Sequence, residues 1–298
     1  RARQNTTGTK IELVSDVSKV FYDLLLSLQQ IEVFKDDTAR LGKNKEDAYN
    51  RFVSGIADKV DHKQASIALN NSLSRLKGAT ETVKAKYALL KQMMGYPSDK
   101  TFTVQFDTAQ MMQEILIDTL APLRFEQRIE YQQIQTAKRI QRETTLYYKM
   151  GFMPSLSAYY SYFHQFQNNE LSELYKHGYP YSLFGVQLNL PIFTGFRRNE
   201  NVRKANLQEQ RTDWDEINIK LNIYTEYNQA MANYKTNLYY LHTHAEKVAM
   251  AREVYNIVKL QYREGIKPYL DLIVAESDLQ TSEINYLNAL FQLLASKI

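Results

Sequence analysis

The chain has 298 residues, a formal net charge of +4 and no cysteine. This length suits one large domain or two ordinary ones, and the small, evenly spread charge argues against a nucleic-acid partner. The lack of cysteine excludes disulfides and thiolate metal ligands. Since no apolar run approaches the roughly 18 residues of a membrane-spanning helix, any passage through a membrane would depend on β-strands.

The first third of the chain predicts long helices that pack along an apolar seam. A loop is expected around residues 42–44, and Gly55 follows a short helical piece. The next helix should begin near Val60 and end at Gly95, because Pro97 lies just beyond. Steps of three and four residues, typical of a coiled coil, separate the apolar positions Val14, Val17, Phe21, Leu24, Leu28 and Ile31.

The middle of the chain changes from helical to strand character. Residues 98–122 predict an irregular connector with one brief helix, and residues 123–150 predict a helix because they contain neither Gly nor Pro. Residues 153–193 predict a β-hairpin with a polar loop, since side chains alternate between apolar and polar along its second arm. One face of that arm would carry Phe184, Val186, Leu188, Leu190 and Ile192.

A very long helix is expected directly after the hairpin. Residues 196–264 again contain neither Gly nor Pro. At a rise of 1.5 Å per residue they would span roughly 100 Å as one helix. A helix of that length cannot enclose a compact core by itself, so it must lie beside other long helices.

Two segments of the chain resemble each other at a constant separation. Residues 50–69 align with 260–279, which are 210 positions further on, as are Gly55 and Gly265. The agreement indicates an internal duplication, and it predicts roughly ninety further residues of the first copy ahead of this sequence. Matched positions include Phe52 with Tyr262, Asp61 with Asp271, Ala65 with Ala275 and Leu69 with Leu279.

The order of these pieces resembles the TolC-type outer-membrane efflux channel family, also called outer membrane factors. MPSLSAYYSY and VQLNLPIFTGFRRNENVRKA match its hairpin and the helix start that follows. YREGIKPYLDLIVAESDLQTSEINYLNAL matches its helical tip and last long helix, and FVSGIADKVDHKQASIAL matches the first-repeat copy of that tip. The sequence departs from the family at Arg124-Phe125-Glu126, where Arg-Pro-Glu is common.

The resemblance implies a mainly α fold in which long antiparallel coiled-coil helices form the wall of a tunnel. In a homotrimer, the hairpin at 153–193 would contribute to a transmembrane β-barrel in the outer membrane of a Gram-negative bacterium, with most of the chain in the periplasm. Residues 1–97 would be the remainder of the first repeat, 98–122 the equatorial connector and 123–298 the second repeat. A periplasmic adaptor and an inner-membrane transporter would dock at the tips. The chain would then be a passive conduit of a tripartite efflux or secretion system for small molecules or polypeptides.

The candidate tip residues surround the two repeated glycines. Gly55 and Gly265 would form the tip turns, with Phe52 and Tyr262 three residues before them. Asp61 and Asp271 would fall in the first turns of the helices that follow, where a carboxylate complements the helix dipole.

The resemblance gives the same acids a second interpretation. In a trimer, Asp61 and Asp271 would each form a ring at the tunnel aperture that favours cations. Lys267 stands where the family often has Arg, so an ion pair that holds the tips together there would lack the two parallel hydrogen bonds of an arginine. Val274 stands where some relatives have a second acidic residue.

Two other classes of protein compete with the channel interpretation. The alternating strand also fits a soluble sheet with one face covered by helices, in a helical coiled-coil scaffold without a membrane barrel. A metal-dependent helical-bundle enzyme is disfavoured, because His242 and His244 do not share a helix face and no Glu-x-x-His pair exists. Without a Ser/His/Asp arrangement, a phosphate loop or a dinucleotide fingerprint, we expect no enzyme activity, catalytic residue, metal or cofactor.

Overall fold

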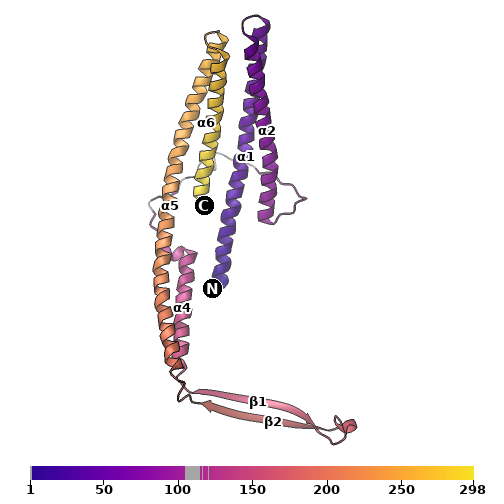
Figure 1. Cartoon of the computed structure of the whole chain (residues 1–298), viewed down its shortest axis with the longest axis vertical. Helices are drawn as coiled ribbons and strands as arrows, with labels where there is room; N and C mark the ends of the chain where they lie inside the picture. Colours follow the sequence, from indigo (N-terminus) through magenta and orange to yellow (C-terminus); the bar gives the residue numbers. More distant parts are fainter. Residues whose placement is uncertain (1, 105–114, 116, 120) are drawn as a thin grey trace. The chain divides into compact units, whose positions relative to one another are not determined.

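A computed structural model describes residues 2–104, 115, 117–119 and 121–298 (Figure 1). The fold is mainly helical with one antiparallel hairpin, as the sequence predicts. In chain order the elements are α1 (Ala2–Val53), α2 (Lys59–Met94), η1 (Phe125–Gln127), α4 (Ile129–Met150), β1 (Ser155–Phe166), η2 (Leu171–Glu173), β2 (Gly178–Asn189), α5 (Arg197–Arg263) and α6 (Tyr269–Ser296).

The chain divides into two units. The first, here called the hairpin unit, comprises Arg124–Asn222 with the N-terminal residues through Gln4. The second, the four-helix unit, comprises Asn5–Leu123 and Ile223–Ile298. Within the four-helix unit, α1 and α2 run antiparallel, as do α6 and the second part of α5, and both connecting turns lie at the same end (Figure 1).

Apolar seams hold the four-helix unit together, and the predicted coiled-coil positions take part. Leu24 and Ile31 are buried against Val83 and Leu90, with Val17, Phe21 and Leu28 packed around them. A second cluster lies nearer the turns and joins Ala48, Ala65, Tyr255, Val258, Tyr262, Tyr269, Leu272, Ala275 and Leu279. A third joins Ile115, Tyr234, Leu241, Leu290, Leu293 and Leu294.

The helix boundaries differ from the predictions in two places. The loop expected at 42–44 is wrong, because α1 continues through it; Leu41 and Asn44 are buried, and tertiary contact outweighs the weak helix propensity of Gly42 and Asn44. The helix expected from residue 123 begins only at Ile129, after η1. The brief helix expected within 98–122 falls largely on residues 105–114, 116 and 120, which lie outside the described part.

The hairpin pairs β1 with β2 from Ser155 opposite Asn189 to Phe166 opposite Gly178. This register places one apolar set on a single face, with Leu156, Ala158 and Tyr160 directly opposite Leu188, Val186 and Phe184. Strand β2 ends at Asn189, so Leu190 and Ile192 follow the strand instead of extending that face. Pro191 explains the early end, because it has no N–H to continue the ladder.

In the hairpin unit, α4 packs along the first part of α5. Lys138 on α4 reaches Glu216 at 2.5 Å and Asp213 at 2.8 Å, and the Gln141 side chain donates to the Ala205 carbonyl at 3.2 Å. Helix α5 itself is continuous over its 67 residues, as its lack of helix breakers predicts.

Candidate functional site

The two tip turns of the four-helix unit share one backbone pattern, 210 residues apart. Gly55 and Gly265 both adopt a left-handed conformation, with φ of 73° and 76°, which glycine allows at little cost. In each turn the residue after the glycine donates to a carbonyl five residues earlier, at 2.9 Å for Ile56 and 2.8 Å for Ile266. The sequence duplication is therefore matched by a repeated structure.

The helices that follow the turns begin with acidic residues. Asp58 caps α2 and accepts from the Val60 amide at 3.3 Å, and Asp61 lies in the first turn of the same helix. Asp271 occupies the equivalent first turn of α6 and forms an ion pair with Lys267 at 3.1 Å. Both acids lie where the sequence predicts them. Asp58 was not singled out, although an Asp directly before a helical run is a recognisable cap signal.

A pocket of about 280 Å³ is lined by residues of both tip turns. Its lining includes Asp61, Tyr262, Gly265 and Lys267 from the predicted set, and Arg51, which was not predicted. Phe52, Gly55 and Asp271 are not part of this lining.

Arg51 connects the first tip to the second. Its Nη1 donates to the carbonyl of Arg263, the last residue of α5, at 2.6 Å, and its guanidinium lies 5.0 Å from the ring centroid of Tyr262. Arg263 in turn pairs with Asp47 on α1 at 3.0 Å. The neighbouring charges also act on Asp61: burial raises the pKa of this carboxyl, Asp58 adds to the rise, and Arg51 opposes it.

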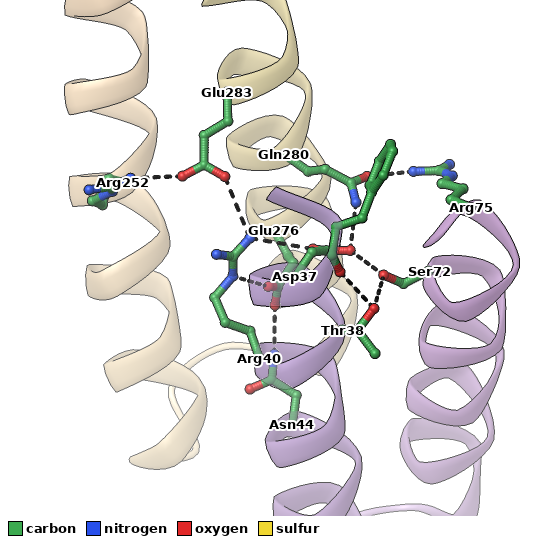
Figure 2. Close-up of polar contacts among 11 residues, drawn as sticks. Asp37, Thr38, Arg40, Asn44, Ser72, Arg75, Arg252, Glu276, Gln280 and Glu283 are labelled. Carbon is green, nitrogen blue, oxygen red and sulfur yellow. Dashed lines mark hydrogen bonds and ion pairs between the residues drawn. The ribbon is translucent and has the colours of Figure 1, made fainter. Parts of the chain in front are cut away.

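A second polar site, which the sequence analysis missed, lies inside the four-helix unit (Figure 2). At 1.5 Å per residue it lies roughly 20 Å along the helices from both tip turns. A signal existed in the sequence, because Glu276 falls between Leu272 and Leu279 on the apolar seam. We call this site the buried polar layer after its buried members, which are Asp37, Asn44, Ser72, Glu276 and Gln280. Its more exposed members are Thr38, Arg40, Arg75, Arg252 and Glu283.

Arg40 and Glu276 form the central ion pair of the layer. Arg40 Nε donates to Glu276 Oε1 at 2.9 Å, and Asn44 Nδ2 donates to the other oxygen at 2.6 Å. The side chain of Glu276 is only 4% exposed and that of Arg40 is 23% exposed. Glu283 lies 3.7 Å from Arg40 and pairs with Arg252 at 2.8 Å, which extends the layer to α5.

Asp37 is the second buried carboxyl and joins three helices. Its Oδ2 lies 2.6 Å from Ser72 Oγ on α2 and 2.5 Å from Gln280 Nε2 on α6. Its Oδ1 has a longer contact, 3.4 Å from Arg40 Nη2. Arg75 donates to the Gln280 side-chain carbonyl, and a cavity of about 160 Å³ lies beside these groups. Burial raises the pKa of both Asp37 and Glu276.

The residues that the structure describes include no group of three His, Asp or Glu side chains arranged to hold a metal ion. In the same part of the chain, none of the helices is both long enough and apolar enough to cross a lipid bilayer.

Residues 147–298 match a family model described as outer membrane efflux protein. No curated protein sequence matches the chain.

Several solved structures share the fold. The outer membrane protein VceC from Vibrio cholerae has a TM-score of 0.74 at 16% identity, covering 99% of this chain and 70% of VceC. A membrane protein from Pseudomonas aeruginosa has a TM-score of 0.80 at 17% identity, covering 99% of this chain and 68% of that protein. The Campylobacter jejuni CmeC outer membrane channel has a TM-score of 0.73 at 16% identity, with 99% and 62% covered.

Proposed function

The chain belongs to the outer membrane efflux protein family, and from this premise we propose that it is a subunit of a trimeric outer-membrane channel. It would serve as a passive conduit in a tripartite efflux or secretion system, with the adaptor and the inner-membrane transporter at the tips. In this proposal the three parts 1–97, 98–122 and 123–298 keep the roles of first-repeat remainder, connector and second repeat.

The observation that carries the proposal is the pair of unlike faces at the end of the hairpin where β1 begins and β2 ends. Phe184, Val186 and Leu188 stand exposed on one face there, together with Leu156 and Tyr160. The opposite face carries the polar side chains Ser155, Ser157, Gln187 and Asn189 at this end, and further along it carries Tyr159, Ser161, Phe163, Tyr181 and Leu183. Apolar-out and polar-in alternation is what a membrane barrel requires, because one face meets lipid and the other meets water.

The soluble-scaffold alternative differs in what covers this apolar face. A scaffold would need a protein partner over Phe184, Val186 and Leu188, whereas a channel places them in lipid. The native protein reconstituted in planar bilayers distinguishes the two: a channel gives stable conductance steps, and a scaffold gives none.

The tip acids should set ion preference if they line the aperture. We expect the Asp61→Asn/Asp271→Asn double variant to lower the cation preference of the reconstituted channel, because rings of carboxylates concentrate cations. Since the pKa of Asp61 is raised, its share of the preference should also decline on acidification earlier than for an ordinary aspartate. The measurement is the reversal potential across a salt gradient.

The control removes the same charge away from the tips. Glu32 and Glu81 are exposed acids on α1 and α2, paired with Lys35 and with Lys77 and Lys84. Glu32→Gln/Glu81→Gln should change the reversal potential much less than the tip double variant. Equal changes in both variants, or none in either, would leave Asp61 and Asp271 as helix-start residues without a role in selectivity.

A further inference from the structure

A row of four oxygen atoms runs through the buried polar layer. The Phe34 carbonyl oxygen lies 2.7 Å from Thr38 Oγ1, which lies 3.0 Å from Ser72 Oγ, which lies 2.6 Å from Asp37 Oδ2. Figure 2 shows Thr38, Ser72 and Asp37 side by side, contributed by α1 and α2. Each separation is within the range of an O–H···O hydrogen bond.

These three contacts require three hydrogen atoms. The hydroxyls of Thr38 and Ser72 supply one each, and the Phe34 carbonyl only accepts. An ionised Asp37 also only accepts, so the row would hold two hydrogens and leave one pair of oxygens facing each other without a proton. A protonated Asp37 supplies the third, and every donor then points the same way, from Asp37 to Ser72, to Thr38 and to the carbonyl.

We propose that Asp37 is protonated in this packed arrangement. The proton completes a hydrogen-bonded network of Asp37, Thr38, Ser72 and Gln280, here called the latch, which joins α1, α2 and α6. The other contacts of Asp37 suit a neutral acid. Its hydroxyl oxygen can still accept from Gln280 Nε2, and its Oδ1 accepts from Arg40 only at 3.4 Å. Gln280 in turn accepts a hydrogen bond from Arg75 on α2.

Three arginines and two glutamates surround Asp37. Arg40 is paired with Glu276 at 2.9 Å, Glu283 is paired with Arg252 on α5 at 2.8 Å, and Arg75 donates to the Gln280 side chain. Asp37 is 2% exposed, and its contact with Arg40 is a long one, at 3.4 Å. Burial raises the pKa of this carboxyl, and Glu283 adds to the rise. Arg40 and Arg75 oppose it, as does Ser72 when its hydroxyl donates to an ionised Asp37.

Glu276, the other buried acid, does not fit the same role. Both of its oxygens face nitrogen donors, Arg40 Nε and Asn44 Nδ2, which cannot accept a proton in return. Asp37 instead faces the Ser72 hydroxyl, which accepts and donates. The geometry therefore favours Asp37 over Glu276 as the protonated member of the layer.

The latch responds to pH with a defined sign. Across the interval from the ordinary aspartate pKa to the raised value, the folded chain keeps a proton that the unfolded chain releases. Folding stability therefore decreases as pH rises through this interval, by up to tenfold in the folding equilibrium constant per pH unit. Acid holds α1 and α2 against α6, and deprotonation loosens them.

Infrared spectroscopy of the full chain tests the proton directly. A protonated carboxyl has a C=O stretch that a carboxylate lacks, and carbon-13 labelling of aspartate shifts this band only if an aspartate carries the proton. We expect a labelled-aspartate band in the wild-type chain that persists to a higher pH than the band of ordinary aspartates, because the pKa of Asp37 is raised. A band that disappears together with that of ordinary aspartates would overturn the proposal. Asp37→Asn should remove the band.

A hydroxyl-deletion pair tests the hydrogen count without touching Asp37. Thr38→Val removes one link of the row and should move the midpoint of the band down by about one pH unit, the tenfold loss in proton affinity expected for one hydrogen bond. Thr80→Val is the matched control, because Thr80 is also half-buried and donates to the carbonyl four residues earlier, at 2.8 Å. A midpoint unchanged by Thr38→Val, or moved equally by both variants, would overturn the latch.

Urea unfolding at several pH values gives a second readout. Thr38→Val should destabilise the chain more in acid, where the row is complete, than above the raised pKa of Asp37. A cost that is independent of pH would mean that Asp37 is ionised throughout. None of these measurements depends on channel activity, so the latch and the proposed function succeed or fail separately.

Discussion

At the scale of single residues, Arg40 decides whether the buried polar layer is stable. It is the cation in contact with Glu276, Asp37 and Glu283. Arg40→Met should lower the free energy of unfolding by about 3–5 kcal/mol, because removing one partner leaves a buried charge uncompensated. The Arg40→Met/Glu276→Leu double variant should recover part of this loss, since an apolar pair removes both charges together.

Urea denaturation of the wild type, of Arg40→Met, of Glu276→Leu and of the double variant measures the coupling energy between Arg40 and Glu276. The exposed pair Lys77–Glu81 is the comparison, and Lys77→Met should cost much less stability than Arg40→Met because solvent screens such pairs. If Arg40→Met were no more costly than Lys77→Met, the layer would not contribute as a buried ion pair.

Individual residues could be predicted from the sequence where the determinant was local. Asp61 and Asp271 were placed in their first turns because each follows a tip glycine at a fixed distance. The contact between Arg40 and Glu276 joins residues 236 positions apart. It depends on how α1 lies against α6, and no local pattern sets that alignment.

At the scale of secondary-structure elements, a glycine in a tip turn and a glycine inside a helix have opposite roles. Gly265 turns the chain at φ 76°, a conformation that strains other residues, whereas Gly78 lies inside α2 with open space around the position of a Cβ. Gly265→Ala should lower stability by about 1 kcal/mol or more, and Gly78→Ala should raise it by about 0.5–1 kcal/mol. Thermal or urea unfolding of both variants checks the two signs, and a stabilising Gly265→Ala would contradict the turn geometry.

The elements themselves were largely predictable, and their errors have physical causes. Heptad spacing identified the seam through Leu24 and Ile31, and the absence of breakers identified α5. The predicted loop at 42–44 failed because Gly42 and Asn44 are poor helix formers only in isolation. In the fold Asn44 is buried and donates to Glu276, which stabilises the helix from outside.

At the scale of the whole molecule, stability is expected to be uneven. In the described part of the chain the sheet has two strands, and a two-stranded hairpin is marginal in water. In dilute, detergent-free solution, backbone amides of residues 153–193 should therefore exchange with solvent much faster than those of 69–90 in α2. Hydrogen exchange followed by mass spectrometry measures both segments in one sample. Equal protection would favour the soluble scaffold, in which the hairpin is held by the chain itself.

The order of helices, hairpin and tips could be predicted from the sequence, because the duplication fixed which segments correspond. The division into two units could not, since their boundary near Asn222 lies inside α5, where the sequence shows no break. Which helices gather into a unit depends on long-range packing, which helix periodicity does not encode.

The bond from Arg51 to the last carbonyl of α5 also means that the second tip is completed by a side chain of the first. The carbonyl of Arg263 has no partner within its own helix, because it lies at the helix C-terminus. An arginine from the turn 210 residues earlier supplies the missing donor, so the two repeated turns are stabilised together and not one by one.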